Sequence, residues 1–459
     1  MLTSITQSIT FKVFGIGFLA LLMLIPLAQV QGLIAERNGM RAHALTDIAQ
    51  RWGAAQQVGG PLLAIPLRTR TLVSNSASEA GRTTTRWTTN ESTEILLADQ
   101  LVYSGKLLQP ELRHYGIYST PVYTAELKIS GRFLANDVRA LVARARAGNS
   151  DTSETTYALE AAELRLPLAD VRGIRRISAL RIDGKEMAFG PGARTDSVLQ
   201  GVALPLDLAQ WSAGESHAFE VELTLAGTES LQFLPLARRT EASLAAAWPN
   251  PSFVGAFLPA EHKVDAQGFD AHWQVLDLNR NFGQHWQEDT NRVYPAGSAF
   301  GVNLYQPADL YQRNERAGKY GVLFVALTFV AFFLFEVLKK LRVHPVQYLL
   351  VGLALTTFYV VLLALSEQIG FAFAYLAAAT AVVLMVGGYA SAVLRARRAG
   401  MLLGLTLSLI YALLYGLVVS EQYSLLMGAI ALLCVVAVLM YLTRKVDWSN
   451  AAPSAATVS

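Results

Sequence analysis

The sequence predicts a membrane protein with six transmembrane α-helices, one N-terminal and five C-terminal, and a large β-rich, sandwich-like domain between the first and second helices. Three observations predict this fold. Hydrophobic residues make up 53% and charged residues 16% of the 459 residues, whereas charged residues are about 25% of a typical soluble protein. The apolar excess lies in residues 11–31 and 320–442. Between these regions, apolar and polar residues alternate with the period of two that is typical of β-strands.

Six apolar segments are each long enough to cross a bilayer, which requires about 20 helical residues. The first is predicted to be an uncleaved signal anchor, because its apolar core is longer than that of a signal peptide and Ala28-Gln29-Val30 matches a cleavage site poorly. A cleaved signal peptide is the alternative, and both interpretations export residues 32–316. The six segments are residues 11–31, 320–338, 346–365, 371–394, 401–419 and 425–442.

The short loops predict the orientation of the chain, since cytoplasmic loops are rich in Lys and Arg. Basic residues follow the second, fourth and sixth segments, whereas the loops at 366–370 and 420–424 contain none. We therefore expect both termini, residues 1–10 and 443–459, in the cytoplasm and residues 32–316 on the opposite side. Three basic residues before the second segment oppose this bias, but long translocated domains cross largely regardless of charge; they are Arg313, Arg316 and Lys319.

The exported domain shows the pattern of half-buried strands. In FEVELTLAG (219–227), the apolar side chains share one face of a strand, and VYTAELKIS (122–130) alternates in the same way. Asp183-Gly184, between two short apolar runs, predicts a β-hairpin. These features favour a sandwich-like β-domain.

Three stretches of the exported region depart from this strand pattern. Residues 33–51 have helical periodicity directly after the first membrane segment. The polar run at 143–156 is a candidate boundary between two lobes. The Ser- and Thr-rich run at 74–85 is predicted to be a mobile loop.

The composition and the motifs argue against several classes of function. A net charge of +3 and the lack of a basic stripe argue against nucleic-acid binding. Cys434, the one cysteine, allows no intrachain disulfide. The sequence contains no HExxH, CxxC, GxSxG or GK[ST] motif, so we expect neither catalytic residues nor a cofactor. Metal binding is not expected either, because His262, His272 and His285 include no pair at helical i,i+4 spacing.

An acid and several bases meet at the junction of the second and third membrane segments. Glu336 lies about one turn from the predicted cytoplasmic end of its helix, and Lys339 and Lys340 follow on the same helical face. We interpret all three as charges that extend to the lipid headgroups; a proton or ion relay through Glu336 is the alternative. We expect His344 in the loop and Pro345 at the first position of the third helix.

A tripeptide recurs in the two predicted outer loops. Ser366-Glu367-Gln368 and Ser420-Glu421-Gln422 each follow a helix that runs outward. The match favours repeated helical hairpins, as in transporters, or results from chance and turn preference.

Several long segments make the chain resemble the CreD family of bacterial inner-membrane proteins. The resemblance covers nearly the whole chain, up to about Asp447-Trp448, and is strongest in FEVLKKLRVHPVQYLLVGLALTTFYVVLLALSEQIGF (335–371). A doubled glycine at 59–60 departs from the family pattern without changing the assignment. The other matching segments are VGGPLLAIP (58–66), ADVRGI (169–174), WPNPSFVGAFLPA (248–260), GFDAHWQ (268–274) and QPADLYQRNERAGKYGVLFVALTF (306–329).

The resemblance implies a periplasmic location for the exported domain and a link to cell envelope integrity. It also implies an association with colicin tolerance and with a two-component stress response to β-lactams. It brings no established reaction and no catalytic residues. Positions in the matching segments are therefore candidate functional positions of unknown role: Glu336, His344, Gln347, Tyr348, Ser366 and Glu367.

Together, these observations predict an inner-membrane protein that supports envelope integrity or envelope stress signalling through non-enzymatic interactions. The expected partners are the lipid bilayer and an envelope protein that contacts the periplasmic domain. One alternative is a transporter or channel component. The other is an envelope-modifying enzyme that acts on peptidoglycan or lipid, since paired carboxylates leave no spacing signature in a sequence.

Overall fold

A computed structural model describes residues 9–76, 83–190, 200–213, 215–288, 293, 295–304, 310–338, 343–393, 397–420 and 424–444 of the chain. The chain divides into two compact units. Residues Met1–Ala42 and Ala308–Ser459 form a helical unit, and His43–Pro307 form a β-rich unit. The boundary between the units falls within α3 (Leu24–Trp52).

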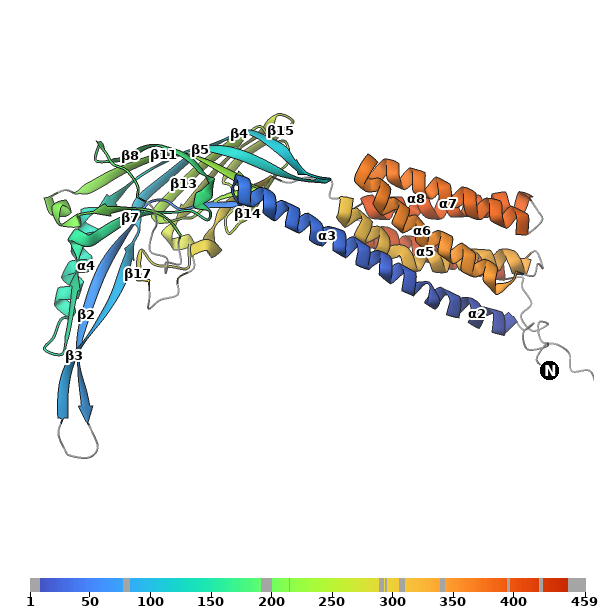
Figure 1. Ribbon diagram of the computed structural model, residues 1–459, viewed down its shortest axis with the longest axis horizontal. Helices are drawn as coiled ribbons and strands as arrows, with labels where there is room; N and C mark the ends of the chain where they lie inside the picture. The colour runs from blue at the N-terminus through green and yellow to red at the C-terminus, as the bar shows by residue number, and fades with distance from the viewer. Residues whose placement is uncertain are drawn as a thin grey trace, which may run out of the picture. The chain divides into compact units, whose positions relative to one another are not determined.

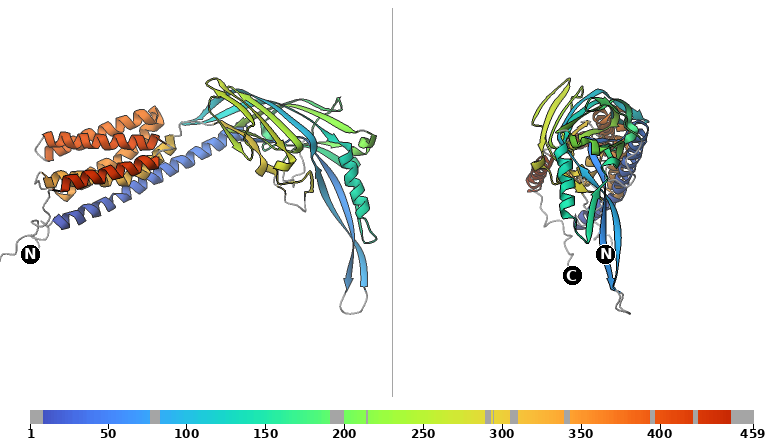
Figure 2. Two further views of the ribbon diagram at one scale, coloured as in Figure 1. Left: turned by 180° about the vertical axis from the view of Figure 1, so that it is seen from behind. Right: turned by 90° about the vertical axis from the view of Figure 1, so that its left-hand side faces the viewer.

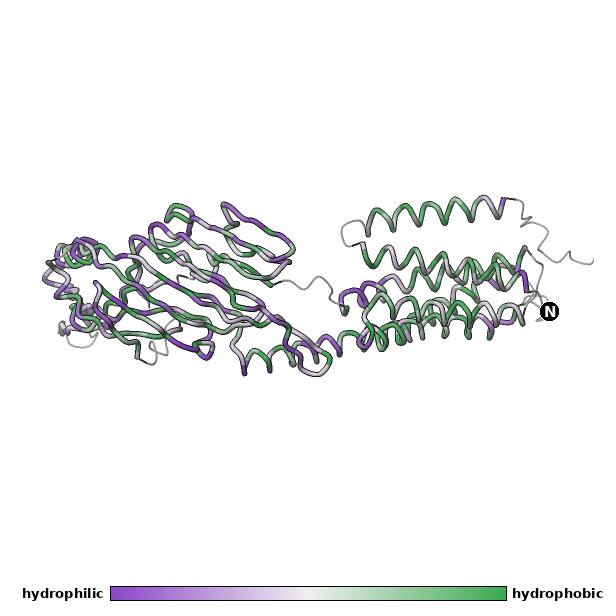
Figure 3. Tube along the Cα trace, turned by 90° about the horizontal axis from the view of Figure 1, so that it is seen from above, coloured by the Kyte–Doolittle hydropathy of each residue, from purple (hydrophilic) through white to green (hydrophobic). Residues whose placement is uncertain are grey.

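The helical unit contains long apolar helices (Figures 1 and 3). Five stretches of the described residues are long and apolar enough to cross a membrane: Lys12–Trp52, Leu310–Val337, Pro345–Ile369, Phe371–Val393 and Arg397–Val419. They match the first five predicted segments, which are confirmed; the sixth lies within α9 and is not among these five spans. The helices are α2 (Ile9–Leu22), α3, α5 (Leu310–Leu338), α6 (Pro345–Ile369), α7 (Phe371–Val393), α8 (Arg397–Val419) and α9 (Ser424–Thr443).

The N-terminal span is interrupted at Met23, where a turn separates α2 from α3. Pro26 causes this interruption, because it has no N–H to donate to the carbonyl of Leu22 and its ring crowds that carbonyl. The helical periodicity predicted at 33–51 is confirmed, since α3 continues to Trp52.

Small residues allow the membrane helices to approach one another closely. A Cβ atom added to Gly352 of α6 would lie 2.6 Å from Met23 Sδ and 2.9 Å from Phe329 Cζ. A Cβ atom on Gly400 of α8 would overlap Ser391 of α7. Small residues at such crossings maximise van der Waals contact in lipid, where the hydrophobic effect does not drive helix association.

The β-rich unit contains three sheets (Figures 1 and 2). The eight-stranded sheet has the order β15-β16-β13-β4-β5-β11-β8-β9, and the four-stranded sheet has the order β1-β12-β18-β14. In the six-stranded sheet the order is β10-β7-β2-β3-β17, and β6 also pairs with β2. The strands are β1 (Gln56–Val58), β2 (Leu62–Ser76), β3 (Thr83–Leu96), β4 (Ala98–Tyr115), β5 (Tyr118–Leu134), β6 (Ser153–Tyr157), β7 (Ala162–Pro167), β8 (Ile174–Ile182), β9 (Lys185–Glu186), β10 (Gly201–Leu206), β11 (Ser216–Thr228), β12 (Ser230–Phe233), β13 (Ala237–Ala246), β14 (Pro251–Gly255), β15 (Glu261–Asp265), β16 (Gly268–Leu276), β17 (His285–Gln287) and β18 (Phe300–Leu304).

The strand patterns that the sequence predicted are confirmed. In β11, Phe219, Val221 and Leu223 are buried and alternate with more exposed residues. Residues Asp183 and Gly184 connect β8 to β9 with positive φ angles of 51° and 78°, as a two-residue hairpin turn requires.

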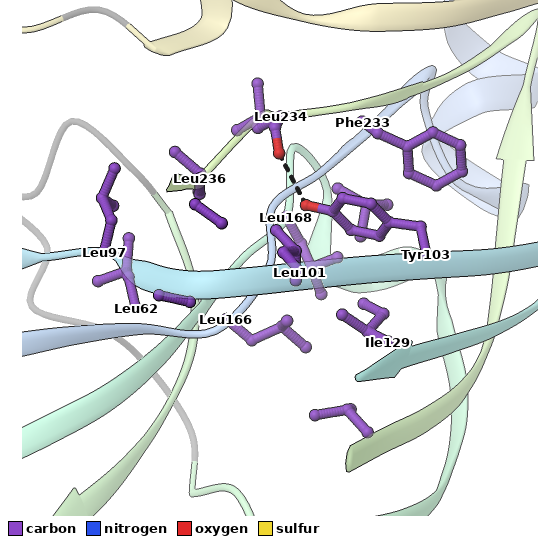
Figure 4. Close-up of a cluster of buried hydrophobic side chains, with 14 of the residues drawn as sticks. Leu62, Leu97, Leu101, Tyr103, Ile129, Leu166, Leu168, Phe233, Leu234 and Leu236 are labelled. Carbon is purple, nitrogen blue, oxygen red and sulfur yellow. Dashed lines mark hydrogen bonds between the residues drawn. The ribbon is translucent and has the colours of Figure 1, made fainter. Parts of the chain in front are cut away.

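The core of the β-rich unit lies between the inner face of the eight-stranded sheet and the other sheets. Tyr103 of β4 donates a hydrogen bond from Oη to the Leu234 carbonyl at 2.8 Å (Figure 4). The Tyr103 ring lies 4.7 Å from that of Phe233 in the four-stranded sheet. Trp273 of β16 lies 5.9 Å from Phe300 of β18. These contacts join two sheets face to face, as in a β-sandwich.

The two polar runs of the exported region form regular structure where the chain is described. The run at 143–156 contains the end of α4 (Ala135–Gly148) and most of β6. The prediction of a loop at 74–85 is wrong at both ends, because β2 extends to Ser76 and β3 begins at Thr83; residues 77–82 lie outside the described residues.

Candidate functional site

The candidate residue Glu336 lies near the end of α5 and is only 3% exposed. Its Oε1 atom accepts hydrogen bonds from Lys12 Nζ at 2.6 Å and from the Val343 backbone N at 3.1 Å. Its Oε2 atom accepts one from Tyr348 Oη at 2.9 Å. These four residues, the Glu336 cluster, connect α2, α5 and α6 through one carboxylate.

The Glu336 cluster compensates the burial of a charge. A buried carboxylate is costly unless a cation and hydrogen-bond donors surround it, and Glu336 has Lys12 as the cation and two neutral donors. The Lys12 side chain is one-third exposed, so its stem reaches from the surface of the unit to the buried oxygen. The interpretation that Glu336 extends to the headgroups with Lys339 and Lys340 does not fit this burial; residues 339–342 lie outside the described residues.

His344 and Gln347 form the N-terminal cap of α6. The Val346 backbone N donates to His344 Nδ1 at 3.3 Å, and the His344 backbone N donates to Gln347 Oε1 at 3.0 Å. This reciprocal arrangement is a capping box, which satisfies backbone donors that a helix start leaves free. Pro345 occupies the first helical position, as predicted.

A second polar group surrounds the other end of α6. Asn314 of α5 donates from Nδ2 to Ser366 Oγ at 2.9 Å, and both side chains are buried. Tyr311 Oη donates to Glu367 Oε1 at 3.1 Å, and Arg37 Nε of α3 lies 3.8 Å from the same oxygen. These five residues, the Ser366 cluster, connect α3, α5 and α6. Ser366 and Glu367 belong to the last turn of α6 rather than to the predicted loop, because α6 ends at Ile369.

The structure therefore divides the six candidate residues into two groups at opposite ends of one helix. His344, Gln347 and Tyr348 lie at the start of α6, with Glu336 of α5 beside them, and Ser366 and Glu367 lie at its end. A helix rises 1.5 Å per residue, so Tyr348 and Ser366 are ~27 Å apart along α6. This separation is close to the ~30 Å thickness of the hydrocarbon core.

Sequence reasoning missed the partners of these residues. Lys12 stands alone in an apolar segment, and Asn314 lies in a polar stretch before the second span. A single charge inside an apolar run is the one signal that pointed to Lys12, since an ionisable group in a span needs a partner. The sequence does not indicate that the partner is Glu336.

The β-rich unit contains buried charges with a different arrangement. Glu94 of β3 is 3% exposed and lies 2.7 Å from His285 Nδ1. Arg144 Nη1 lies 3.1 Å from His285 Nε2; because a guanidinium only donates, Nε2 must be the acceptor. Both ring nitrogens are therefore engaged in polar contacts within the β-rich unit. Burial, together with the charge of Glu94, raises the pKa of Tyr157 to about 12.

Among the described residues, no group of three or more His, Cys, Asp or Glu side chains is placed to hold a metal ion. His262 and His272 lie on the paired strands β15 and β16, whereas His285 belongs to another sheet. The side-chain hydrogen bonds and ion pairs of both clusters described above join one helix of the unit to another, and the remaining donor, the Val343 backbone N, lies just before the start of α6. This arrangement stabilises helix packing.

The fold and the clusters define a multi-pass membrane protein with a large β-rich unit. The sequence model of one family, "Inner membrane protein CreD", matches residues 8–449. The chain is 35% identical over 428 residues to the Inner membrane protein CreD of Escherichia coli (strain K12), which covers 93% of this chain and 91% of that protein. The chain therefore belongs to the CreD family of inner-membrane proteins, as its matching segments predicted.

Proposed function

We propose that the protein supports cell envelope integrity, or the response to envelope stress, through non-enzymatic interactions of its β-rich unit. The proposal is supported by the hydrogen bonds that the buried polar groups of the helical unit make. Glu336, Asn314 and Ser366 direct their donors and acceptors to other helices and backbone groups. A helical unit with such contacts is suited to anchor a large interaction domain in the membrane.

The proposal includes a specific topology. Both termini face the cytoplasm, the β-rich unit lies in the periplasm, and α9 is a sixth span. The length of α9, 20 residues, is what a bilayer requires. The Glu336 cluster supports the cytoplasmic N-terminus, because it brings Lys12 to the same end of the helical unit as the end of α5 and the start of α6. In the sequence, the basic residues Lys339, Lys340 and Arg342 fall between these two helices. Reporter fusions at residues 200 and 455 test this topology. A reporter at residue 200 that is active in the cytoplasm, or a reporter at residue 455 that is active outside the cytoplasm, would contradict it.

The functional test compares two chains in a strain that lacks its own CreD-family protein. The intact chain is expected to restore survival under β-lactam and detergent stress. A chain in which a flexible linker replaces residues 53–304 is expected to reach the membrane in equal amount but to restore nothing. Equal restoration by both chains would contradict a role for the β-rich unit.

A transporter or channel component is the second candidate, and the buried Glu336 is the observation that favours it, since ionisable groups within spans often mark ion paths. Solute flux in proteoliposomes above that of empty vesicles would support this candidate. Incubation of the intact purified protein with sacculi and lipids tests the enzymatic alternative, because new products would contradict a non-enzymatic role.

A further inference from the structure

The first part of α5, residues 310–320, carries basic residues on one side of the helix. Arg313, Arg316 and Lys319 follow one another at intervals of three residues, so each lies about 60° around the helix from the one before it. The three therefore share a sector of about 120°, here called the α5 basic face. Glu315 is the only acidic residue in this part of the sequence, and its carboxylate lies 2.8 Å from Lys319 Nζ. The beginning of α5 thus carries an excess of positive charge.

Another side of α5 packs inside the helical unit. Asn314 Nδ2 donates to Ser366 Oγ of α6, and the Gly318 carbonyl accepts from Gln31 Nε2 of α3 at 3.5 Å. The Lys319 side chain, by contrast, is 66% exposed. The α5 basic face therefore points away from the contacts with α3 and α6.

The start of the apolar run sets the level of the α5 basic face in a bilayer. The apolar run of this span begins at Tyr320, directly after Lys319. When this run occupies the hydrocarbon core, the basic residues before it lie among the lipid headgroups. The helix rises ~9 Å from Arg313 to Lys319, and the headgroup layer of one leaflet is about 5–8 Å thick. The α5 basic face is therefore long enough to cross this layer, and Tyr320 lies at the interface, where tyrosine is enriched.

Arg313 is held at this level by an aromatic contact with another helix. Its guanidinium carbon lies 5.9 Å from the centroid of the Phe371 ring, at the first residue of α7. The Phe371 ring stacks in turn on that of Tyr415 of α8, with centroids 6.5 Å apart and an interplanar angle of 16°. A guanidinium over a ring keeps its N–H groups in its own plane, in the fork geometry that matches two phosphate oxygens.

We propose that the α5 basic face binds the phosphate of an anionic phospholipid. Arg313 makes the two-point contact with the phosphate, and Arg316 and Lys319 add positive charge around it. An anionic headgroup fits better than a zwitterionic one, because a choline or ethanolamine cation would be repelled by the excess positive charge of this helix end. A phospholipid is the occupant because lipid surrounds a membrane span at the headgroup level, where its local concentration is far above that of soluble anions.

The distribution of basic residues along the sequence supports this proposal. Lys and Arg normally gather at one end of a membrane span. The span in α5 has basic residues at both ends, since residues 339–342 follow it and the α5 basic face precedes it. A site for an anionic headgroup gives the basic residues of the first end a role that the charge bias leaves unexplained.

Brominated lipids test the proposal in the intact protein, because bromine quenches a fluorophore only at short range. With Cys434→Ser as the background, Ala372→Cys carries a bimane label at an exposed position next to Phe371. The labelled protein is reconstituted in phosphatidylcholine vesicles in which a minor fraction of either phosphatidylglycerol or phosphatidylcholine is brominated. We expect a preference for phosphatidylglycerol at the label of at least about fivefold, which one basic residue near an anionic surface contributes.

Charge variants show whether the α5 basic face causes this preference. Arg313→Gln combined with Lys319→Gln should abolish most of it, whereas Arg313→Lys, which keeps the charge but not the fork, should retain part of it. The matched control is Arg68→Gln combined with Lys263→Gln. It also removes one arginine and one lysine, each paired with a carboxylate in the β-rich unit, and should leave the preference unchanged.

A second label separates a local site from a general effect. On Met401→Cys, at the exposed start of α8, the lipid preference should be the same with and without the changes at Arg313 and Lys319. An equal change at both labels would overturn the proposal, as would equal quenching by the two lipids or a preference that survives the double variant. A preference that inorganic phosphate removes, but chloride of equal ionic strength does not, would also overturn it and assign the site to a soluble anion.

Discussion

The two ends of α6 stabilise the helical unit by different means. At its start, a buried carboxylate accepts from a lysine at 2.6 Å and from two neutral donors. At its end, the buried contact is a neutral hydrogen bond between Asn314 and Ser366, and the ion pair between Arg37 and Glu367 is long, at 3.8 Å. The Glu336 cluster depends on a single cation from a helix far away in the sequence, whereas the contacts of the Ser366 cluster are shared among several side chains. Removing one partner should therefore lower the free energy of unfolding more at the start of α6 than at its end.

The largest effect is expected from Lys12→Met. This change leaves the buried Glu336 carboxyl without its cation, and breaking such a pair costs about 3–5 kcal/mol. The loss in the free energy of unfolding is measured in mixed detergent micelles, with intrinsic fluorescence as the probe of unfolding. Lys12→Arg keeps the cation and should lose much less. A Lys12→Met chain as stable as the unchanged protein would contradict the contrast between the two ends.

A smaller effect is expected from Asn314→Leu. The change removes the hydrogen bond to Ser366 Oγ, but Ser366 still donates to the Leu363 carbonyl, so we expect a loss of about 1–2 kcal/mol. The same micelle assay applies. Thr328→Val is the control, because the buried Thr328 hydroxyl donates its hydrogen bond within its own helix, to Phe324 O. This variant should lose less stability than Asn314→Leu.

Loss of the cap at the start of α6 should destabilise the first turn of this helix and leave its last turn unchanged. His344→Ala removes the side chain that accepts from Val346 N, and loss of an N-cap costs about 1 kcal/mol. Hydrogen exchange should become faster in the first turn of α6 and remain unchanged in its last turn. His344→Asn, which supplies another capping acceptor, should preserve the slow exchange. Faster exchange along the whole helix would show that His344 does more than cap.

The smallest effect is expected from Glu367→Gln. Arg37 is more than one-third exposed and distant from Glu367, and the amide oxygen of glutamine can still accept from Tyr311. Pairs of this kind contribute at most about 1 kcal/mol. Glu367→Leu removes the acceptor as well and should cost more. If Glu367→Gln lowered the free energy of unfolding as much as Lys12→Met does, the two ends of α6 would not differ in how strongly their contacts stabilise the helical unit.

The sequence predicted the elements whose signals are local. An apolar run long enough to cross a bilayer identifies a span, and the alternation in 219–227 identifies β11, because each pattern records which face is buried. Residues 83–85 at the start of β3 were predicted to belong to a loop, because the Ser- and Thr-rich sequence there has no apolar alternation that marks a strand. The pairing of Lys12 with Glu336 was not predictable, since the two residues are 324 positions apart and only the packing of α2 against α5 brings them together.

A double-mutant cycle on Lys12 and Glu336 measures how strongly this lysine and this carboxyl stabilise each other. The cycle compares the unfolding free energies of Lys12→Met, Glu336→Gln and the combined variant. If Lys12 is the cation that compensates the buried carboxylate, Glu336→Gln should restore much of the stability that Lys12→Met removes, with a coupling energy of at least about 1.5 kcal/mol. Losses that simply add would contradict the account.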